Sequence, residues 1–600
     1  MSKRNEQVSE TQHAFLVAWG QYAQEIGLVE AIEAVQLKQK TYRHTPQTKV
    51  LEFLVALMSG LRQLQDISLA AHPLEKDQAV AEAWGQPGWA DYTGISRTMS
   101  SLSDEEVQSL RAGLESVSRP FLTQEVREVR RKGERIRLDG DLTGIPVSST
   151  STSYPNAAFG HMNADVRLGY QAGVVSFTSP TYGRLWLSVA HHPGDTVSST
   201  QAENLVMEAE RQLGLQPRRR TELLKKRISV LEKAGDPIRE RLAKQQDALN
   251  KAQKRLNEIQ AQLQKRQTLV KELEHEYQLR DRIERPTSKL AQARNRYVAG
   301  GRRFESQKRK ISQIQVRWEK TKTRLVVHRA EVDDLQQRLV RFTQENEANP
   351  DPPEMEFRLD AGFGTYKNIA LLVELGYEIY TKPHSHKVVE YLQRQTNDET
   401  VWDRVGANAE MTAWQDFQLK NCAYPFNTAL ERFYTGKKLK HSALLHFGSD
   451  PVTQNLSEWF SHYNGRQTIE AGIKEAKQVF YLHRIKVRSE PAIVLQEAFV
   501  IFTANFIRWA AYWMQTQAEP AENALPIEKM GIKRQVHVGA HVSAQVVRNS
   551  EGLLLKFSPY SAFAGKVLAI KSAKLSGGRS SPQFRLLFLA FLRRFLPNHT

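Results

Sequence analysis

The stretch Tyr463-Asn-Gly-Arg466-Gln-Thr-Ile-Glu470-Ala-Gly-Ile-Lys-Glu-Ala-Lys477 carries the strongest pattern in the chain. Its Tyr, Arg, Glu and Lys follow one another at intervals of three, four and seven residues. On a helix these intervals place the four side chains within an arc of about 60°. A carboxylate would then lie among two cations and a phenol, which suits a metal-bound acid beside a phosphate backbone. Because Asn464-Gly465 is a turn signal, the helix is expected to begin near Arg466.

This spacing resembles the Y-(2)-R-(3)-E-(6)-K signature of the transposases of insertion-sequence family four. The resemblance implies a DDE transposase with a ribonuclease-H-like catalytic core, in which three acids catalyse DNA cleavage and strand transfer. It implies that Glu470 is the third acid, and that Tyr463, Arg466 and Lys477 bind the transposon end. Glu475 is the second choice for the third acid, because it lies off the stripe. Two aspartates must then lie upstream.

Asp141 and Asp360 are the candidates for these two acids. Each comes at the predicted end of a short strand, the second being Glu356-Phe-Arg-Leu-Asp360. Asp139 competes with Asp141 for the first position. The resemblance favours Asp141, because Asp141-x-Thr143 looks like the family's first-acid context. At the second position Asp360-x-Gly362 matches, but Thr365 stands where the family has an aromatic residue.

The three carboxylates Asp141, Asp360 and Glu470 are also the predicted metal ligands. Hard cations prefer carboxylate oxygens, and two Mg²⁺ ions would neutralise charge on both the attacking and the leaving oxygen of a phosphodiester. Mn²⁺ is expected to substitute. The resemblance further implies a β-rich insertion before Glu470 with a tryptophan that holds a flipped base during hairpin formation, for which Trp402, Trp414 and Trp459 are candidates.

The net charge of +18 is concentrated in one segment. Residues 217–347 contain 34 Lys and Arg against 18 Asp and Glu, an excess of +16, whereas the rest of the chain contains 50 against 48. Two heptad runs, 238–277 and 311–342, predict an antiparallel coiled-coil hairpin with its tip near 282–287. Gly235-Asp-Pro237 and Gly300-Gly301 are expected to break or bend its arms. A basic excess of this kind is typical either of a nucleic-acid-binding surface or of a well-solvated coiled coil.

Together these patterns predict an α/β ribonuclease-H-like core interrupted by the hairpin and preceded by an all-α domain. In chain order we expect a helical DNA-binding domain (1–130), a first core segment (131–215), the basic hairpin (216–348) and a second core segment (349–384). A mixed or β-rich insertion (385–450), a third core segment (451–515) and a C-terminal region (516–600) follow. The apolar segment 492–514 carries Glu497, Asn505 and Arg508, so we expect a buried helix and no membrane span. A basic amphipathic tail is expected at 584–596.

The predicted function is cut-and-paste transposition of an insertion sequence. The partners would be the double-stranded DNA of the transposon ends and target, and a second copy in a synaptic homodimer. The single cysteine, Cys422, and the lack of an apolar run behind the N-terminus predict a cytoplasmic protein. Two alternatives stay open: a coiled-coil protein that bridges DNA, and a domesticated transposase that binds DNA without cutting it.

Overall fold

The structure is a computed structural model, and it describes residues 7–40, 43–150, 154–162, 165–517, 523–549 and 552–571. The chain forms two compact units. One contains Met1–Arg218 together with Asp351–Thr600, and the other is Arg219–Pro350. The expected amphipathic tail at 584–596 lies outside the described residues.

A ten-stranded mixed sheet forms the centre of the first unit, in the order β3-β4-β2-β6-β7-β11-β10-β9-β8, with β5 paired to β4. Its middle pairs, β2 with β6 and β6 with β7, are parallel, and the other pairs are antiparallel. The strands are β2 (Ile136–Pro146), β3 (Ala158–Met162), β4 (Asp165–Ser179), β5 (Gly183–Pro193), β6 (Met355–Leu359), β7 (Glu378–Thr381), β8 (Asp403–Arg404), β9 (Ala409–Phe417), β10 (Phe426–Thr435) and β11 (Lys438–Phe447). The segment expected as an insertion, 385–450, therefore continues the same sheet through the pairing of β11 with β7.

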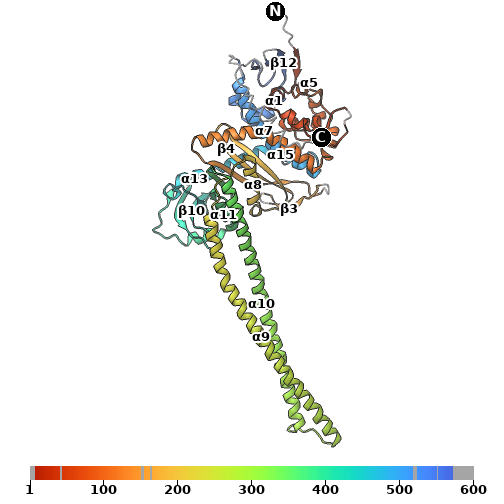
Figure 1. Ribbon diagram of the computed structural model, residues 1–600. Helices are drawn as coiled ribbons and strands as arrows, with labels where there is room; N and C mark the ends of the chain where they lie inside the picture. The colour runs from red at the N-terminus through yellow and green to blue at the C-terminus, as the bar shows by residue number, and fades with distance from the viewer. Residues whose placement is uncertain are drawn as a thin grey trace, which may run out of the picture. The chain divides into compact units, whose positions relative to one another are not determined.

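Helices pack against this sheet and connect its strands (Figure 1). They are α8 (Ala202–Leu213), α11 (Tyr366–Glu374), α12 (His386–Gln393), α13 (Leu456–Asn464), α14 (Gln467–Gln478) and α15 (Glu490–Gln517), with short 3₁₀ turns at Ser198–Thr200 and Val452–Gln454. α11 lies between the parallel strands β6 and β7 in the chain, so these three elements form a β-α-β unit. The mixed α/β class is confirmed.

The N-terminal region is helical, but it is not all-α. Its helices are α1 (Ala14–Glu25), α2 (Leu28–Glu33), α3 (Pro46–Met58), α4 (Asp66–Leu69), α5 (Gln78–Ala83), α6 (Tyr92–Ser100) and α7 (Asp104–Arg131), with a 3₁₀ turn at Leu74–Lys76. It begins with a strand, β1 (Gln7–Thr11), which pairs with β12 in a four-stranded sheet. The other strands of this small sheet come from the C-terminal part of the chain. Its elements are α16 (Ile532–His537), β12 (Ala544–Asn549), β13 (Gly552–Phe557) and β14 (Val567–Lys571), with 3₁₀ turns at Ile527–Lys529 and Gly539–His541. Sequence periodicity does not predict β1, because its partner strand lies at the other end of the chain.

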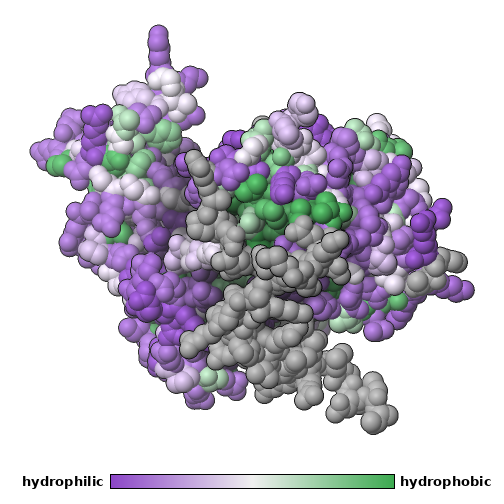
Figure 2. Space-filling view, turned by 90° about the horizontal axis from the view of Figure 1, so that it is seen from above, coloured by the Kyte–Doolittle hydropathy of each residue, from purple (hydrophilic) through white to green (hydrophobic). Residues whose placement is uncertain are grey.

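The apolar helix α15 is long and apolar enough to cross a membrane, and 78% of its most apolar stretch is buried within the structure. It contacts α1, α3, α6, α7 and β5. Two of its polar residues have partners in the sheet: the Asn505 amide bonds both the backbone N–H and the carbonyl of Trp186, and Glu497 pairs with His191. Figure 2 shows a mostly hydrophilic surface on the face in view, with the hydrophobic residues gathered mainly in one area.

The second unit is a pair of long helices, α9 (Thr221–Leu279) and α10 (Lys289–Ala348), that lie side by side (Figure 1). They are antiparallel, because Glu232 bonds Gln336 near one end and Glu274 pairs with Arg294 near the other. The tip spans 280–288 and includes the predicted 282–287. At 1.5 Å per residue, helices of 59 and 60 residues are about 90 Å long.

The predicted heptad positions are the protected positions of both helices. All twelve in α9 and all ten in α10 are buried or half-buried, and most neighbouring positions are exposed. The expected breaks do not occur, because α9 continues through Pro237 and α10 through Gly300-Gly301. Gly235 and Gly300 instead lie where the helices approach closely: an added Cβ would lie 3.1 Å from the His328 ring and 3.0 Å from Leu263 respectively.

Candidate functional site

The first two candidate acids lie side by side at the centre of the large sheet. β2 and β6 pair in parallel from Ile136 opposite Met355 to Gly140 opposite Leu359. The next step of this register is Asp141 beside Asp360. Asp360 follows the end of β6, as the sequence predicts. Asp141 does not end its strand, however, because β2 continues to Pro146 along β4.

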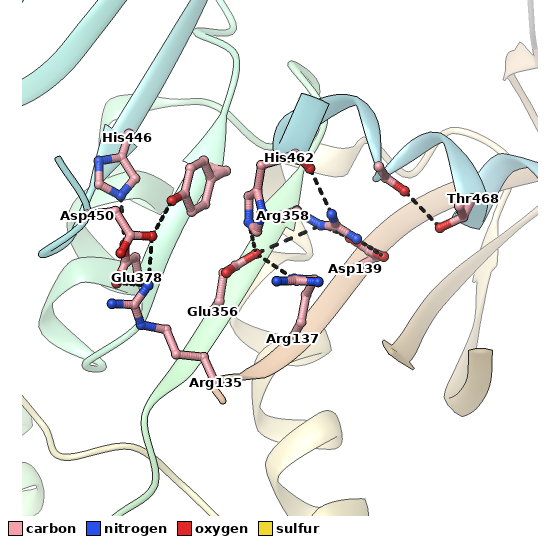
Figure 3. Close-up of polar contacts among 12 residues, drawn as sticks. Arg135, Arg137, Asp139, Glu356, Arg358, Glu378, His446, Asp450, His462 and Thr468 are labelled. Carbon is pink, nitrogen blue, oxygen red and sulfur yellow. Dashed lines mark hydrogen bonds and ion pairs between the residues drawn. The ribbon is translucent and has the colours of Figure 1, made fainter. Parts of the chain in front are cut away.

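Asp139 has a structural partner. It is the register partner of Arg358, whose guanidinium donates to both carboxylate oxygens at 2.6 and 2.8 Å (Figure 3). The two residues are 1% and 4% exposed, so this is a buried bidentate ion pair. Arg358 also donates to the carbonyl of His462 at 2.8 Å, which ties the end of α13 to β6. Of the two competing aspartates, Asp141 is the one without a bidentate arginine.

The four signature residues do not lie on one helix. Tyr463 belongs to α13, and α14 begins after Arg466, as the turn signal suggested. Tyr463 is buried, its hydroxyl donates to the carbonyl of Leu359 at 3.3 Å, and Lys382 lies 5.4 Å over its ring. It thus fastens α13 to the strand end that precedes Asp360.

Arg466 lies between two of the acids. Its guanidinium is 3.0 Å from a Glu470 oxygen and 3.5 Å from an Asp141 oxygen, and the residue is only 8% exposed. Lys477, near the end of α14, donates from Nζ to the carbonyl of Gly144 on β2 at 2.8 Å. Glu470 is the exposed member of the set. The side chains of Tyr463, Arg466 and Lys477 therefore all bond to other residues of the protein.

Burial and like charges shape the electrostatics of this site. Burial first, and then the neighbouring Asp360 carboxylate, raise the pKa of Asp141 to about 6. The charge of Arg466 opposes this rise, and Glu470 adds to it. Burial lowers the pKa of Lys477, and the negative charge of Asp141 partly offsets the effect. Asp360 and Glu470 are therefore close enough to Asp141 to repel its charge.

The donor set fits a hard cation, because it consists of carboxylate oxygens only. The ligand oxygens of Asp141, Asp360 and Glu470 do not all lie within 4.8 Å of one another, and Arg466 holds the position between Asp141 and Glu470. A cation between the carboxylates would relieve the repulsion that raises the pKa of Asp141. Binding by all three requires Glu470 to exchange Arg466 for the metal.

A second cluster of titratable side chains lies where β7 and β11 pair. His446, Glu378 and Asp450 bring three possible ligand atoms within 4.8 Å, the only such group among the described residues. Arg135 already occupies this group, at 3.1 Å from Glu378 and 2.7 Å from Asp450 (Figure 3). Burial opposes ionisation of Asp450, but its bonds from Arg135 and Tyr380 hold its pKa at about 2. A cation would have to displace the arginine, so the arrangement is that of a structural ion-pair network.

Two basic residues near the acids were not predicted from the sequence. Lys382 directly follows β7, at the same strand edge as Asp360, and lies 3.8 Å from Glu431. Burial lowers its pKa, and the charge of Arg466 adds to the effect. Arg358 is the second. Both could have been found by asking which cations share the strand edge, or the strand face, with the candidate acids.

Burial and side-chain contacts distinguish the candidate tryptophans from one another and give Glu475 a separate role. Trp459 is 1% exposed within an apolar cluster, so it is a core residue. Trp402 is half-buried with Arg432 at 4.1 Å over its ring, and Trp414 is half-buried beside Phe417. Glu475 pairs with Arg508 of α15 at 2.9 Å, which gives it a structural partner away from the acids.

No protein-family model matches the chain, and no curated protein matches its sequence.

The two neighbouring aspartates should respond differently to neutralisation. Asp139→Asn removes the bidentate partner of the buried Arg358 guanidinium, leaves Glu356 at 4.0 Å as its nearest acid, and should lower the free energy of unfolding by about 3 kcal/mol. Asp141→Asn removes a half-buried carboxylate that Asp360 repels, so stability should change little or rise. Urea unfolding of both variants at pH 7 makes the comparison. Equal losses, or the reverse order, would contradict the assignment of Asp139 as structural and Asp141 as functional.

The Asp450 network should stabilise the fold above pH 4. The folded pKa of Asp450 lies below its ordinary value, so its stabilisation is complete above that ordinary value and is lost as the pH falls towards 2. After allowance for its partly exposed carboxylate, Asp450→Asn should lower unfolding free energy at pH 7 by about 1–2 kcal/mol. The difference from wild type should shrink between pH 4 and pH 3.

Asp351→Asn is the matched control, because Asp351 pairs with Arg130 at an exposed position. It should cost less than about 1 kcal/mol. A difference between wild type and Asp450→Asn that does not depend on pH would show that the charge of Asp450 is not what stabilises the fold.

Proposed function

We propose that the protein is a DDE-type DNA transposase with a ribonuclease-H-like core, and that Asp141, Asp360 and Glu470 are its catalytic acids. The observation that carries the proposal is the convergence of these three carboxylates from β2, the end of β6 and α14. They are separated by up to 329 positions in the chain, and the same three residues complete the transposase-like pattern in the sequence.

The proposed reaction is metal-dependent cleavage at a transposon end followed by strand transfer. Two Mg²⁺ ions, replaceable by Mn²⁺, would activate the attacking water or 3′-hydroxyl and stabilise the leaving oxygen. Asp141 and Asp360 would hold metal from neighbouring strands. Glu470 would complete the ligand set from α14, and its exposed position lets it reorient. A hairpin intermediate would fit this class of reaction, with Trp402 and Trp414 as the half-buried candidates for stacking a flipped base.

Three cations surround the acids and suit a phosphate backbone. Arg466 would release Glu470 to the metal and donate instead to a DNA phosphate, because its planar fork suits a phosphate as well as a carboxylate. Lys477 and Lys382 would act as further point charges. Tyr463 would position α13 through its bond to Leu359, and that bond leaves it no free donor for DNA.

The proposal is tested with the purified full chain and linear DNA carrying the sequences that flank its reading frame. Wild type should cut at defined positions with Mg²⁺ or Mn²⁺ and should not cut in EDTA. Asp360→Asn and Glu470→Gln should each lower the cleavage rate by at least about 10³-fold, the scale of losing a group that stabilises the transition state. Both variants should still retard the DNA in a gel.

Glu475→Gln is the matched control, because it removes a carboxylate from the same helix while its partner is Arg508. It should cut at close to the wild-type rate. Near wild-type cutting by Glu470→Gln would overturn the assignment of the acids.

A DNA-bridging protein is the second candidate, and the observation that favours it is the concentration of positive charge on the helix pair. Such a protein would bind two duplexes without cutting either. It would show the same gel retardation in wild type and in all acid variants, with no cleavage by any of them. The same experiment therefore separates the two functions.

A further inference from the structure

The side-chain pairs of the two long helices fix their register. If the predicted core positions are a and d, then Arg294 and Glu274 both occupy e, and they pair at 2.7 Å. Arg227 and Glu331 both occupy g, and they lie 3.6 Å apart. In an antiparallel coiled coil, the e positions of the two helices face each other along one flank, and the g positions face each other along the opposite flank. The two ion pairs mark these flanks.

The g flank of α10 carries a row of cations. Arg296, Arg303, Lys310, Arg317 and Arg324 recur at intervals of seven residues, and all five are exposed. Within the second unit, all of which the structure describes, none of their side chains has an ion pair or hydrogen-bond partner. Five successive heptads thus present the same charge on the same side. We call these five residues the basic row.

The facing helix adds to this charge. The g positions of α9 along the row are Arg241, Ala248, Arg255, Gln262 and Leu269. Two-stranded coiled coils normally place opposite charges across such a flank. Here seven cations meet no acid at the facing positions. The nearby acids of α9 lie at other positions, and Glu240 and Asp247 pair with lysines of their own helix.

The charge is also concentrated along the length of the helix pair. Residues 234–269 with 294–329 contain 20 Lys and Arg against 6 Asp and Glu. The tip, 270–293, contains five of each, and the remaining residues of 217–347 contain nine against seven. A coiled coil that needs charge only for solubility has no reason to collect it in the middle of its length, where like charges repel and destabilise the pair.

We propose that the basic row, with Arg241 and Arg255, binds the phosphate backbone of duplex DNA along the flank of the helix pair. The choice of duplex DNA among polyanions rests on the proposed function. From residue 296 to residue 324 the row is about 42 Å long. At 3.4 Å per base pair this corresponds to about 12 base pairs. The g flank is the DNA-binding side, and the e flank is not.

The test removes four charges from the row in the full chain. The row variant carries Arg303→Gln, Lys310→Gln, Arg317→Gln and Arg324→Gln. The matched control carries Arg302→Gln, Arg309→Gln, Lys320→Gln and Arg329→Gln, which removes three arginines and one lysine from the same stretch outside the row. Binding to a 40-base-pair duplex of arbitrary sequence is measured in EDTA between 50 and 200 mM salt, so that cleavage plays no part.

In the row variant, the slope of log K against log salt should become shallower by about 2 to 4, because each lost phosphate contact removes about 0.9. Affinity at 100 mM salt should fall at least tenfold. The control should lose less than a third of each effect. The row variant should melt at the same temperature as wild type or higher, because it removes repulsion, and this separates lost binding from lost folding.

Equal losses in both variants, or no loss in the row variant, would overturn the proposal. Binding of wild type to phosphatidylserine vesicles through the row, with duplex affinity unchanged in the row variant, would overturn it in favour of a membrane surface. The outcome is independent of the proposed catalysis. If the row variant cleaves DNA and binds it normally, only the proposed role of the basic row is refuted. If wild type binds DNA through the basic row but never cleaves it, only the proposed transposase activity is refuted.

Discussion

The parallel pairing of β2 with β6, held by the buried ion pair between Asp139 and Arg358, is the constraint on which the candidate site depends. Two hundred and nineteen positions of chain separate these residues, and the helix-pair unit lies within that interval. Their bidentate pair lies across the strand pair two residues before Asp141 and Asp360. A shift of one residue in register would move one of the two aspartates to the opposite face of the sheet. The ion pair therefore sets which carboxylates meet.

The third acid is positioned by contacts of a different kind. Tyr463 and the His462 carbonyl hold α13 to β6, while Lys477 holds α14 to β2. Arg466 then bridges Asp141 and Glu470 in the region where a cation would bind. The arrangement resembles a site in which an internal cation replaces the metal. Its exchange for Mg²⁺ would couple metal binding to the release of Arg466 towards DNA, so that substrate and metal would assemble the site together.

Much of this could be predicted where the pattern is local. The heptads predict both helices and their tip, and the short strand pattern that ends in an acid predicts β6 and the position of Asp360 after it. The sequence could not show that Asp139 rather than Asp141 meets Arg358, because that depends on strand register between distant segments of the chain. The breaks expected at Gly235-Asp-Pro237 and Gly300-Gly301 do not occur, because local propensity favours a break whereas Gly235 and Gly300 lie where the two long helices pack closely. β1 was missed for the corresponding reason: its pairing is entirely non-local.

Asp141, Asp360 and Glu470 are proposed to form a divalent-metal site. The most direct measurement is a crystal structure of the protein with duplex DNA and Mn²⁺, using Glu475→Gln as a comparison and recording the anomalous signal of manganese. We expect anomalous peaks between Asp141 and Asp360, with Glu470 turned from Arg466 to the metal. Manganese found instead at Glu378, His446 and Asp450, or Arg466 still bonded to Glu470 with no peak at the acids, would contradict the proposal.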